Sequence, residues 1–159
     1  MARQHRFHGD PGRFGVVADF VADTFGRDIR YIADVAGGQG FLSRLLNKRG
    51  YRAEVIDPRG WTMVGVESRA EEYTAEMAGY YDLVIGLHPD QALRAVAESG
   101  VVRPTLVVPC CNFWSADEKL GRDALLDELS RFFAAAHVAH DRVTLDFHGP
   151  QNVGLLTQP

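Results

Sequence analysis

The chain has 159 residues, of which 46% are hydrophobic and 24% are charged, and its formal net charge is −4. This length fits one domain better than two, and the ordinary globular composition excludes intrinsic disorder and fibrous repeats. No run approaches the roughly 18 consecutive apolar residues of a membrane span, and the first residues lack the apolar core of a signal peptide. A cytoplasmic protein without a membrane partner is therefore expected.

The first fourteen residues carry a local basic charge, because they contain three arginines, Arg3, Arg6 and Arg13, but only one acidic residue, Asp10. One interpretation is a set of phosphate contacts with RNA, although the whole chain lacks the basic excess usual for nucleic-acid binders. The other, more frequent interpretation is a solvated and partly mobile segment over residues 1–13.

The two cysteines, Cys110 and Cys111, are adjacent in the sequence. Neighbouring residues rarely reach ordinary disulfide geometry, so an extracellular disulfide framework is not indicated. The two spaced Cys/His pairs of a structural zinc site are also missing. We therefore expect reduced thiols and no metal site.

Short β-type runs alternate with helical runs along the chain, which predicts an α/β sheet with helices on both faces. Apolar spacing predicts helices over 14–25, 41–49, 89–99 and 125–136. Strands are predicted at 31–35, 52–56, 82–87 and 105–108, with a weak candidate near 64–69. Two last runs, 143–147 and 153–157, flank Gly149-Pro150 and predict a C-terminal antiparallel hairpin.

The most informative segment is IADVAGGQGFLSRLL at residues 32–46, in which a strand ends, glycines turn the chain and a helix begins. Such a loop lets the backbone approach a ligand closely and points helix N–H groups into the crevice at the strand ends. Asp57 ends the next strand about twenty residues later, where a carboxylate can accept hydrogen bonds from ribose hydroxyls. The loop and the acid together predict a nucleoside-cofactor site.

The glycine spacing limits which nucleoside cofactor this is. A dinucleotide fingerprint needs glycine at its first, third and sixth positions, but the chain has Gly38, Gly40 and then Ser43. A nicotinamide-dependent oxidoreductase is therefore disfavoured, although it stays open as an alternative. A Walker loop is excluded because no Gly-Lys-Ser/Thr follows the turn.

The segment resembles the first motif of class I S-adenosylmethionine (SAM)-dependent methyltransferases, an acid followed by alternating glycines. Asp34, Gly38 and Gly40 match this motif, and Ala36 stands in place of its first glycine. Asp57 matches the family's ribose-binding acid. Glu72 lies where the family places an acidic or polar residue near the adenine, and DLVIGLH at 82–88 looks like the fourth motif.

A narrower resemblance concerns a subgroup of these methyltransferases, some of which modify RNA. GFLSR at 40–44, Gly-Leu-His at 86–88 and Pro-Cys-Cys at 109–111 are similar to its helix-start and strand-end motifs. The resemblance covers about residues 30–115. It implies a Rossmann-like doubly wound, mostly parallel sheet that forms a single SAM-dependent methyltransferase domain over 1–159, with S-adenosylhomocysteine (SAH) as product.

The resemblance also implies a set of cofactor contacts, which lie after strands one, two and four. These residues are Asp34, Ala36, Gly37, Gly38, Gly40, Asp57, Pro58, Glu72, Gly86 and Leu87.

The ends of the fourth and fifth strands should frame the transferred methyl group. They carry the candidate catalytic residues His88 and Asp90 and the candidate substrate contacts Cys110, Cys111, Asn112 and Trp114. All of them except Asn112 have a structural alternative: a helix cap for His88, a helix-dipole contact for Asp90, buried packing for the thiols and core closure for Trp114.

We expect the acceptor to be a small molecule or a nucleotide, including RNA, because no added recognition domain is recognisable in the sequence. A non-catalytic SAM-binding partner subunit is a further alternative, and self-association is left open.

Overall fold

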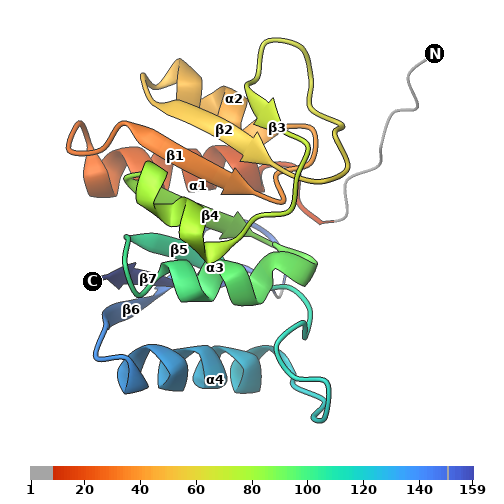
Figure 1. Ribbon diagram of the computed structural model, residues 1–159, viewed down its shortest axis with the longest axis vertical. Coiled ribbons are helices and arrows are strands. Elements are labelled where there is room, and N and C mark those ends of the chain that lie inside the picture. Colours follow the sequence, from red (N-terminus) through yellow and green to blue (C-terminus); the bar gives the residue numbers. More distant parts are fainter. Residues whose placement is uncertain (1–8, 150) are drawn as a thin grey trace.

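The computed structural model describes residues 9–149 and 151–159. Its centre is a seven-stranded sheet in the order β3-β2-β1-β4-β5-β7-β6 (Figure 1). Strands β1 to β5 pair in parallel, and β7 is antiparallel to both of its neighbours. The strands are β1 Tyr31–Val35, β2 Arg52–Ile56, β3 Ser68–Arg69, β4 Leu83–Leu87, β5 Thr105–Val108, β6 Ala139–Thr144 and β7 Val153–Gln158. The predicted doubly wound, mostly parallel sheet with a C-terminal antiparallel hairpin is confirmed.

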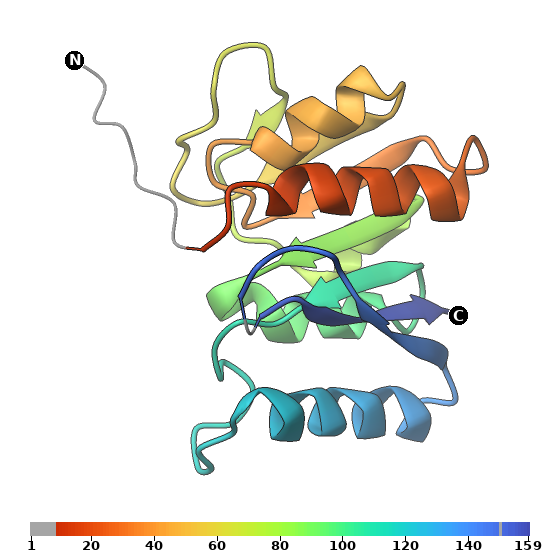
Figure 2. The same cartoon turned by 180° about the vertical axis from the view of Figure 1, so that it is seen from behind.

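Helices cover both faces of the sheet (Figures 1 and 2). They are the α-helices α1 Arg13–Phe25, α2 Phe41–Lys48, α3 Leu93–Ser99 and α4 Arg122–Ala135, and the 3₁₀ helices η1 Ala75–Tyr80 and η2 Asp90–Ala92. Helices α1 and α2 share one apolar cluster with the sheet, and α3 and α4 share the other. Among the described helices, none has the length and apolar character that crossing a membrane requires.

The period-two alternation of the strands divides the core between these two clusters. In β1, Ile32 belongs to the α1/α2 cluster, whereas Ala33 and Val35 belong to the α3/α4 cluster. Every residue of β4 is buried, as predicted from its unbroken apolar run. The buried central strands therefore fix the positions from which the loops at their carboxyl ends begin.

The C-terminal hairpin differs from its prediction in the first arm. We predicted residues 143–147, but β6 spans Ala139–Thr144. The apolar residues Leu145 and Phe147 leave the strand and pack in the α1/α2 cluster, where they are 2% and 7% exposed. The true strand is a polar, mostly exposed edge, so it lacks the apolar signal that predicted the wrong boundaries. The weak third strand is shorter than expected, covering only Ser68–Arg69.

The topology determines where a ligand can bind. Strand β1 pairs with both β2 and β4, so the direction of strand addition reverses there. Ligands of open α/β sheets bind beyond the carboxyl ends of the strands at such a switch point. The segments after β1, β2, β4 and β5 consequently meet at one edge of the sheet.

Candidate active site

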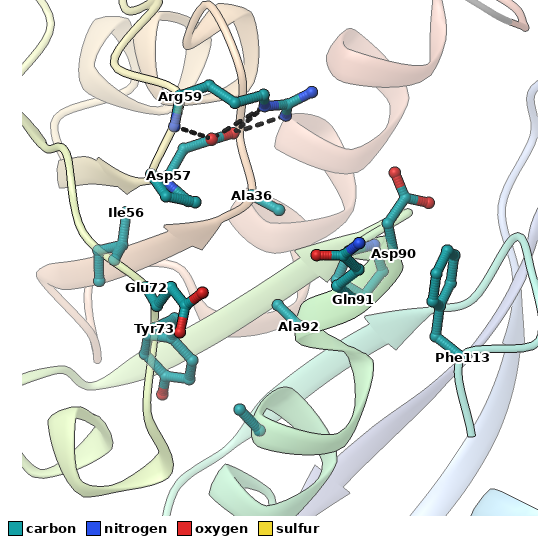
Figure 3. A pocket seen from close by; sticks show the side chains of 13 residues that line it. Ala36, Ile56, Asp57, Arg59, Glu72, Tyr73, Asp90, Gln91, Ala92 and Phe113 are labelled. Carbon is teal, nitrogen blue, oxygen red and sulfur yellow. Dashed lines mark hydrogen bonds and ion pairs between the residues drawn. The ribbon is translucent and has the colours of Figure 1, made fainter. Parts of the chain in front are cut away.

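Two adjoining cavities lie at this edge, of about 570 Å³ and about 710 Å³. Ala36, Arg59 and Asp90 line both of them, so we treat the two as one crevice. Figure 3 shows the first cavity, with Asp57 and Arg59 on one side and Asp90 and Phe113 across from them. The second cavity adds Asp34, the glycine loop, His88 and both cysteines.

The glycine loop joins β1 to α2 through left-handed backbone. Ala36, Gly38 and Gly40 have φ values of 55°, 60° and 88°. A Cβ on Gly37 would lie 2.5 Å from Asp34 Cγ, so only glycine fits there. Ala36 keeps its conformation at a cost of about 1 kcal/mol, since a left-handed non-glycine residue is strained. Its N–H donates to Ile56 O at 2.9 Å, which fixes the loop to the end of β2.

Asp34 connects the loop to the start of α2. Its carboxylate is 2% exposed and accepts hydrogen bonds from Ser43 N at 3.2 Å and Ser43 Oγ at 2.8 Å. Burial raises the pKa of Asp34 to about 6, although the Ser43 hydrogen bonds act in the opposite direction. An ionisable group is therefore held at the floor of the second cavity against the cost of desolvation.

Asp57 lies at the end of β2, is 2% exposed and lines the first cavity. Its carboxylate accepts the Gly38 N–H at 3.0 Å and the Arg59 N–H at 2.9 Å. The Arg59 guanidinium approaches it to 2.6 Å, as drawn in Figure 3. Burial acts to raise the pKa of Asp57, but the hydrogen bonds from Arg59 and Gly38 together hold it below its ordinary value.

The chain after β4 is strained on both sides of Pro89. His88 and Asp90 have φ values of 52° and 50°, a conformation that non-glycine residues seldom adopt. His88 Nε2 lies 2.9 Å from Gln151 O. A carbonyl only accepts hydrogen bonds, so Nε2 carries the hydrogen and Nδ1 keeps its lone pair when the ring is neutral. Burial lowers the pKa of His88, which favours this neutral form.

The structure excludes the helix-cap role of His88 but agrees with a helix-dipole contact of Asp90. The N-cap of η2 is Pro89, with no side-chain capping bond from the described residues, so His88 does not serve as the helix cap. Asp90 does stand in the first turn of η2, as the dipole interpretation expected. It also lines both cavities and accepts the Cys110 thiol at 3.2 Å.

Both cysteines line the second cavity as free thiols. Burial and the nearby Asp90 carboxylate raise the pKa of Cys110, so this thiol stays protonated and donates to Asp90. The possible ligand atoms of Asp90, Cys110 and Cys111 lie within 4.8 Å of one another. The structure thus brings together three residues that the sequence singled out separately.

Four of the predicted site residues lie outside the linings of both cavities, as far as the described residues show: Gly40, Gly86, Asn112 and Trp114. The Asn112 side chain organises its own loop, accepting from Trp114 N and Ser115 N and donating to Glu118 O at 2.7 Å. Trp114 packs against Phe132 with ring centroids 5.4 Å apart. This is the core-closing role that was its structural alternative.

Gly86 faces α3, and its missing side chain permits that contact. A Cβ there would lie 2.8 Å from Val96 Cγ1. We expect Gly86→Ala to lower the free energy of unfolding by about 1–3 kcal/mol, because overpacking displaces α3 from β4. Urea denaturation measures this loss. Gly121→Ala is the control, since a Cβ there would meet nothing within 4 Å; equal stability of the two variants would contradict the packing role.

Several cavity residues were missed by sequence reasoning, and Arg59 is the most important. It follows Asp57 by two residues in the turn after β2, a position from which a guanidinium can reach the acid. Gln151 has no signal in the sequence, because the antiparallel hairpin brings it to the site. Arg13 lines the second cavity, whereas Arg3 and Arg6 lie outside the described residues.

No protein-family model matches the chain, and no curated protein matches its sequence. Solved structures do match its fold. A sugar N-methyltransferase, KedS8, from Streptoalloteichus sp. is 12% identical with a TM-score of 0.58, over 99% of this chain and 96% of that one. The chain has the class I methyltransferase fold.

Other structures with this fold are longer than the chain. A Burkholderia thailandensis O-methyltransferase family protein matches at 15% identity and a TM-score of 0.53, over 89% of this chain and 55% of that one. The 1,6-didemethyltoxoflavin-N1-methyltransferase of Burkholderia thailandensis, solved with bound SAH, is 16% identical with a TM-score of 0.58, over 93% and 77%. At these identities the likeness concerns the fold.

Proposed function

We propose that the chain is a SAM-dependent methyltransferase acting on a small-molecule or nucleotide acceptor. The observation that carries this proposal is the buried Asp57 carboxylate at the end of β2, joined to the left-handed glycine loop by the Gly38 N–H bond of 3.0 Å. The fold supports it as well, since the sugar and toxoflavin enzymes with this fold are named as methyltransferases.

The residues of the crevice fit an adenosine-bearing cofactor. Asp57 would hold the ribose hydroxyls, and Glu72, Tyr73 and Gln91 line the cavity beyond it, where an adenine ring would lie. The glycine loop and Asp34 line the other cavity, where the amino-acid end would lie. Leu87 belongs to the same lining. Ala36 lines both cavities, so the ring and the amino-acid group of a bound cofactor would lie on opposite sides of it.

A bound SAM supplies a methyl group on a sulfonium, a reactive leaving group already built into the cofactor. The chain then has to orient the acceptor and exclude water. His88 Nδ1, with its lone pair directed away from the Gln151 bond, can take a proton from an acceptor hydroxyl or amine. Asp90 and Cys110 hold the strained segment beside it through their 3.2 Å contact.

The nicotinamide alternative is less favoured by the strand order. Dinucleotide-binding sheets add a parallel sixth strand beside the fifth, whereas antiparallel β7 occupies that place here. The non-catalytic alternative requires cofactor binding without transfer, so it is an outcome of the same experiment.

Calorimetric titration with SAM, SAH and NADH, followed by transfer of a labelled methyl group to pools of nucleotides and small molecules, tests the proposal. We expect SAM and SAH to bind with a 1:1 stoichiometry and labelled product to form from one acceptor class. Binding without any transfer would favour the partner-subunit alternative. Preferential binding of NADH would overturn the proposal.

A further inference from the structure

The Asp57 carboxylate has no acceptor site left for a ribose. From the described residues it accepts five hydrogen-bond contacts from four N–H groups, because both oxygens share the Arg59 Nε–H. Oδ1 accepts the Arg59 backbone N–H and Nε–H, both at 2.9 Å. Oδ2 accepts Arg59 Nη2 at 2.6 Å, Nε at 3.2 Å and Gly38 N at 3.0 Å. A carboxylate offers about four lone-pair sites, so all of them are engaged.

These donors differ in how easily they can leave. The N–H groups of Gly38 and Arg59 are fixed in the glycine loop and in the turn after β2, whereas the guanidinium is at the end of a flexible side chain that is 46% exposed. The Arg59 guanidinium also lies over the Trp61 ring, 4.9 Å from its centroid. That ring offers a surface on which the cation can rest once it has left the acid.

We propose that Arg59 is an internal competitor of the cofactor, whose guanidinium must release Asp57 before the ribose of an adenosine-bearing ligand can bind. The proposal rests on the proposed function. Arg59 lines both cavities, so the released cation stays at the border of the crevice. SAM carries a positive sulfonium that SAH lacks, and the arginine therefore disfavours SAM more than SAH. Arg59 is on this account a specificity-determining residue.

The test compares Arg59→Gln with wild type by calorimetry, using SAM, SAH and adenine as probes. Adenine lacks the diol and does not need Asp57. We expect the variant to bind SAH about tenfold more tightly, SAM with a larger gain, and adenine without change, because one charge-assisted contact no longer competes. Arg59→Lys keeps the positive charge but lacks the planar guanidinium that donates two N–H groups to one carboxylate. Its affinities for SAH and SAM should lie between those of wild type and Arg59→Gln.

Arg142→Gln is the matched control. Arg142 also pairs with an aspartate, Asp127, at 2.9 Å, but neither residue lines a cavity among the described residues. We expect its affinities to equal those of wild type. An independent measurement follows the Arg59 Nε–H signal by NMR. We expect Asp57 to protect this N–H from exchange in the unliganded chain, and we expect the protection to be lost when SAH is added.

The outcomes separate the two proposals. If SAH binds wild type but Arg59→Gln binds it equally or more weakly, the competitor role is overturned and the proposed function stands. Retained protection of Nε–H in the SAH complex would likewise overturn the competitor role alone. If neither SAM nor SAH binds any variant, both proposals fail. Binding by Arg59→Gln with none by wild type would support both.

Discussion

Replacing Asp57 by alanine is expected to weaken SAH binding about tenfold in the wild-type background and about a hundredfold in the Arg59→Gln background. In wild type the ribose can hydrogen-bond to the carboxylate only after the Arg59 guanidinium has released it. The loss of the Arg59–Asp57 contact therefore cancels part of the binding free energy that the ribose hydrogen bonds contribute. Once Arg59 is gone, the full value of the ribose hydrogen bonds is measured. Calorimetric titration of the two single variants and the double variant completes a double-mutant cycle.

The control for this cycle is Asp127→Ala, which removes a carboxylate that is also paired with an arginine, 2.9 Å away on the surface. Its SAH affinity should equal that of wild type. Equal effects of Asp57→Ala in both backgrounds would show that Asp57 and Arg59 act independently on the ligand. An Asp57→Ala chain that binds SAH as tightly as wild type would remove the carboxylate from the cofactor site altogether.

The fold could be predicted because apolar residues mark its core strands, most clearly in β4, where all five residues are buried. The same signal failed at β6, which is an edge strand of polar residues, Ala139–Thr144. Apolar residues beyond it were mistaken for the strand, although Leu145 is buried beneath α1 and α2 rather than paired in the sheet. Apolar patterns in a sequence indicate buried residues. An exposed edge strand has few apolar residues, so its bounds cannot be predicted from such a pattern.

The candidate site could be predicted where residues lie at, or just after, the carboxyl ends of neighbouring parallel strands. Topology alone brings Asp34, Asp57, His88 and Cys110 to one edge of the sheet, and each of them lines a cavity. The order of the strands does not predict the direction in which a side chain points. Gly86 is in a site motif yet faces Val96, and Arg59, which no motif singles out, reaches the acid that the motif provides.

The ionisation of Asp34 is expected to make the stability of the fold depend on pH. The pKa of its carboxyl is raised from 3.8 to about 6 in the folded chain, chiefly by burial. Between these two values the folded state binds a proton that the unfolded state does not. The free energy of unfolding therefore falls by about 3 kcal/mol as the pH rises from about 4 to about 6, and this loss persists above pH 6.

Asparagine cannot ionise, so Asp34→Asn should lack this loss. We expect the variant to match wild type near pH 4 and to exceed its stability by about 3 kcal/mol at pH 7, as measured by urea denaturation across this range. The lowered pKa of His88 adds an opposite slope near pH 6, but it does so in both proteins and cancels in their difference. Parallel profiles for the two proteins would contradict the buried, ionisable Asp34.

A carboxylate that destabilises the fold at neutral pH needs a function to explain it. Asp34 lines the second cavity, where its charge would attract the ammonium of a bound amino-acid group. Asp34→Asn should therefore bind SAH several-fold more weakly at pH 7 while being more stable, a trade-off common at sites held in strained or desolvated states. Calorimetry and denaturation on the same sample measure both effects, and a variant that gains stability without losing affinity would make Asp34 a residue of the loop alone.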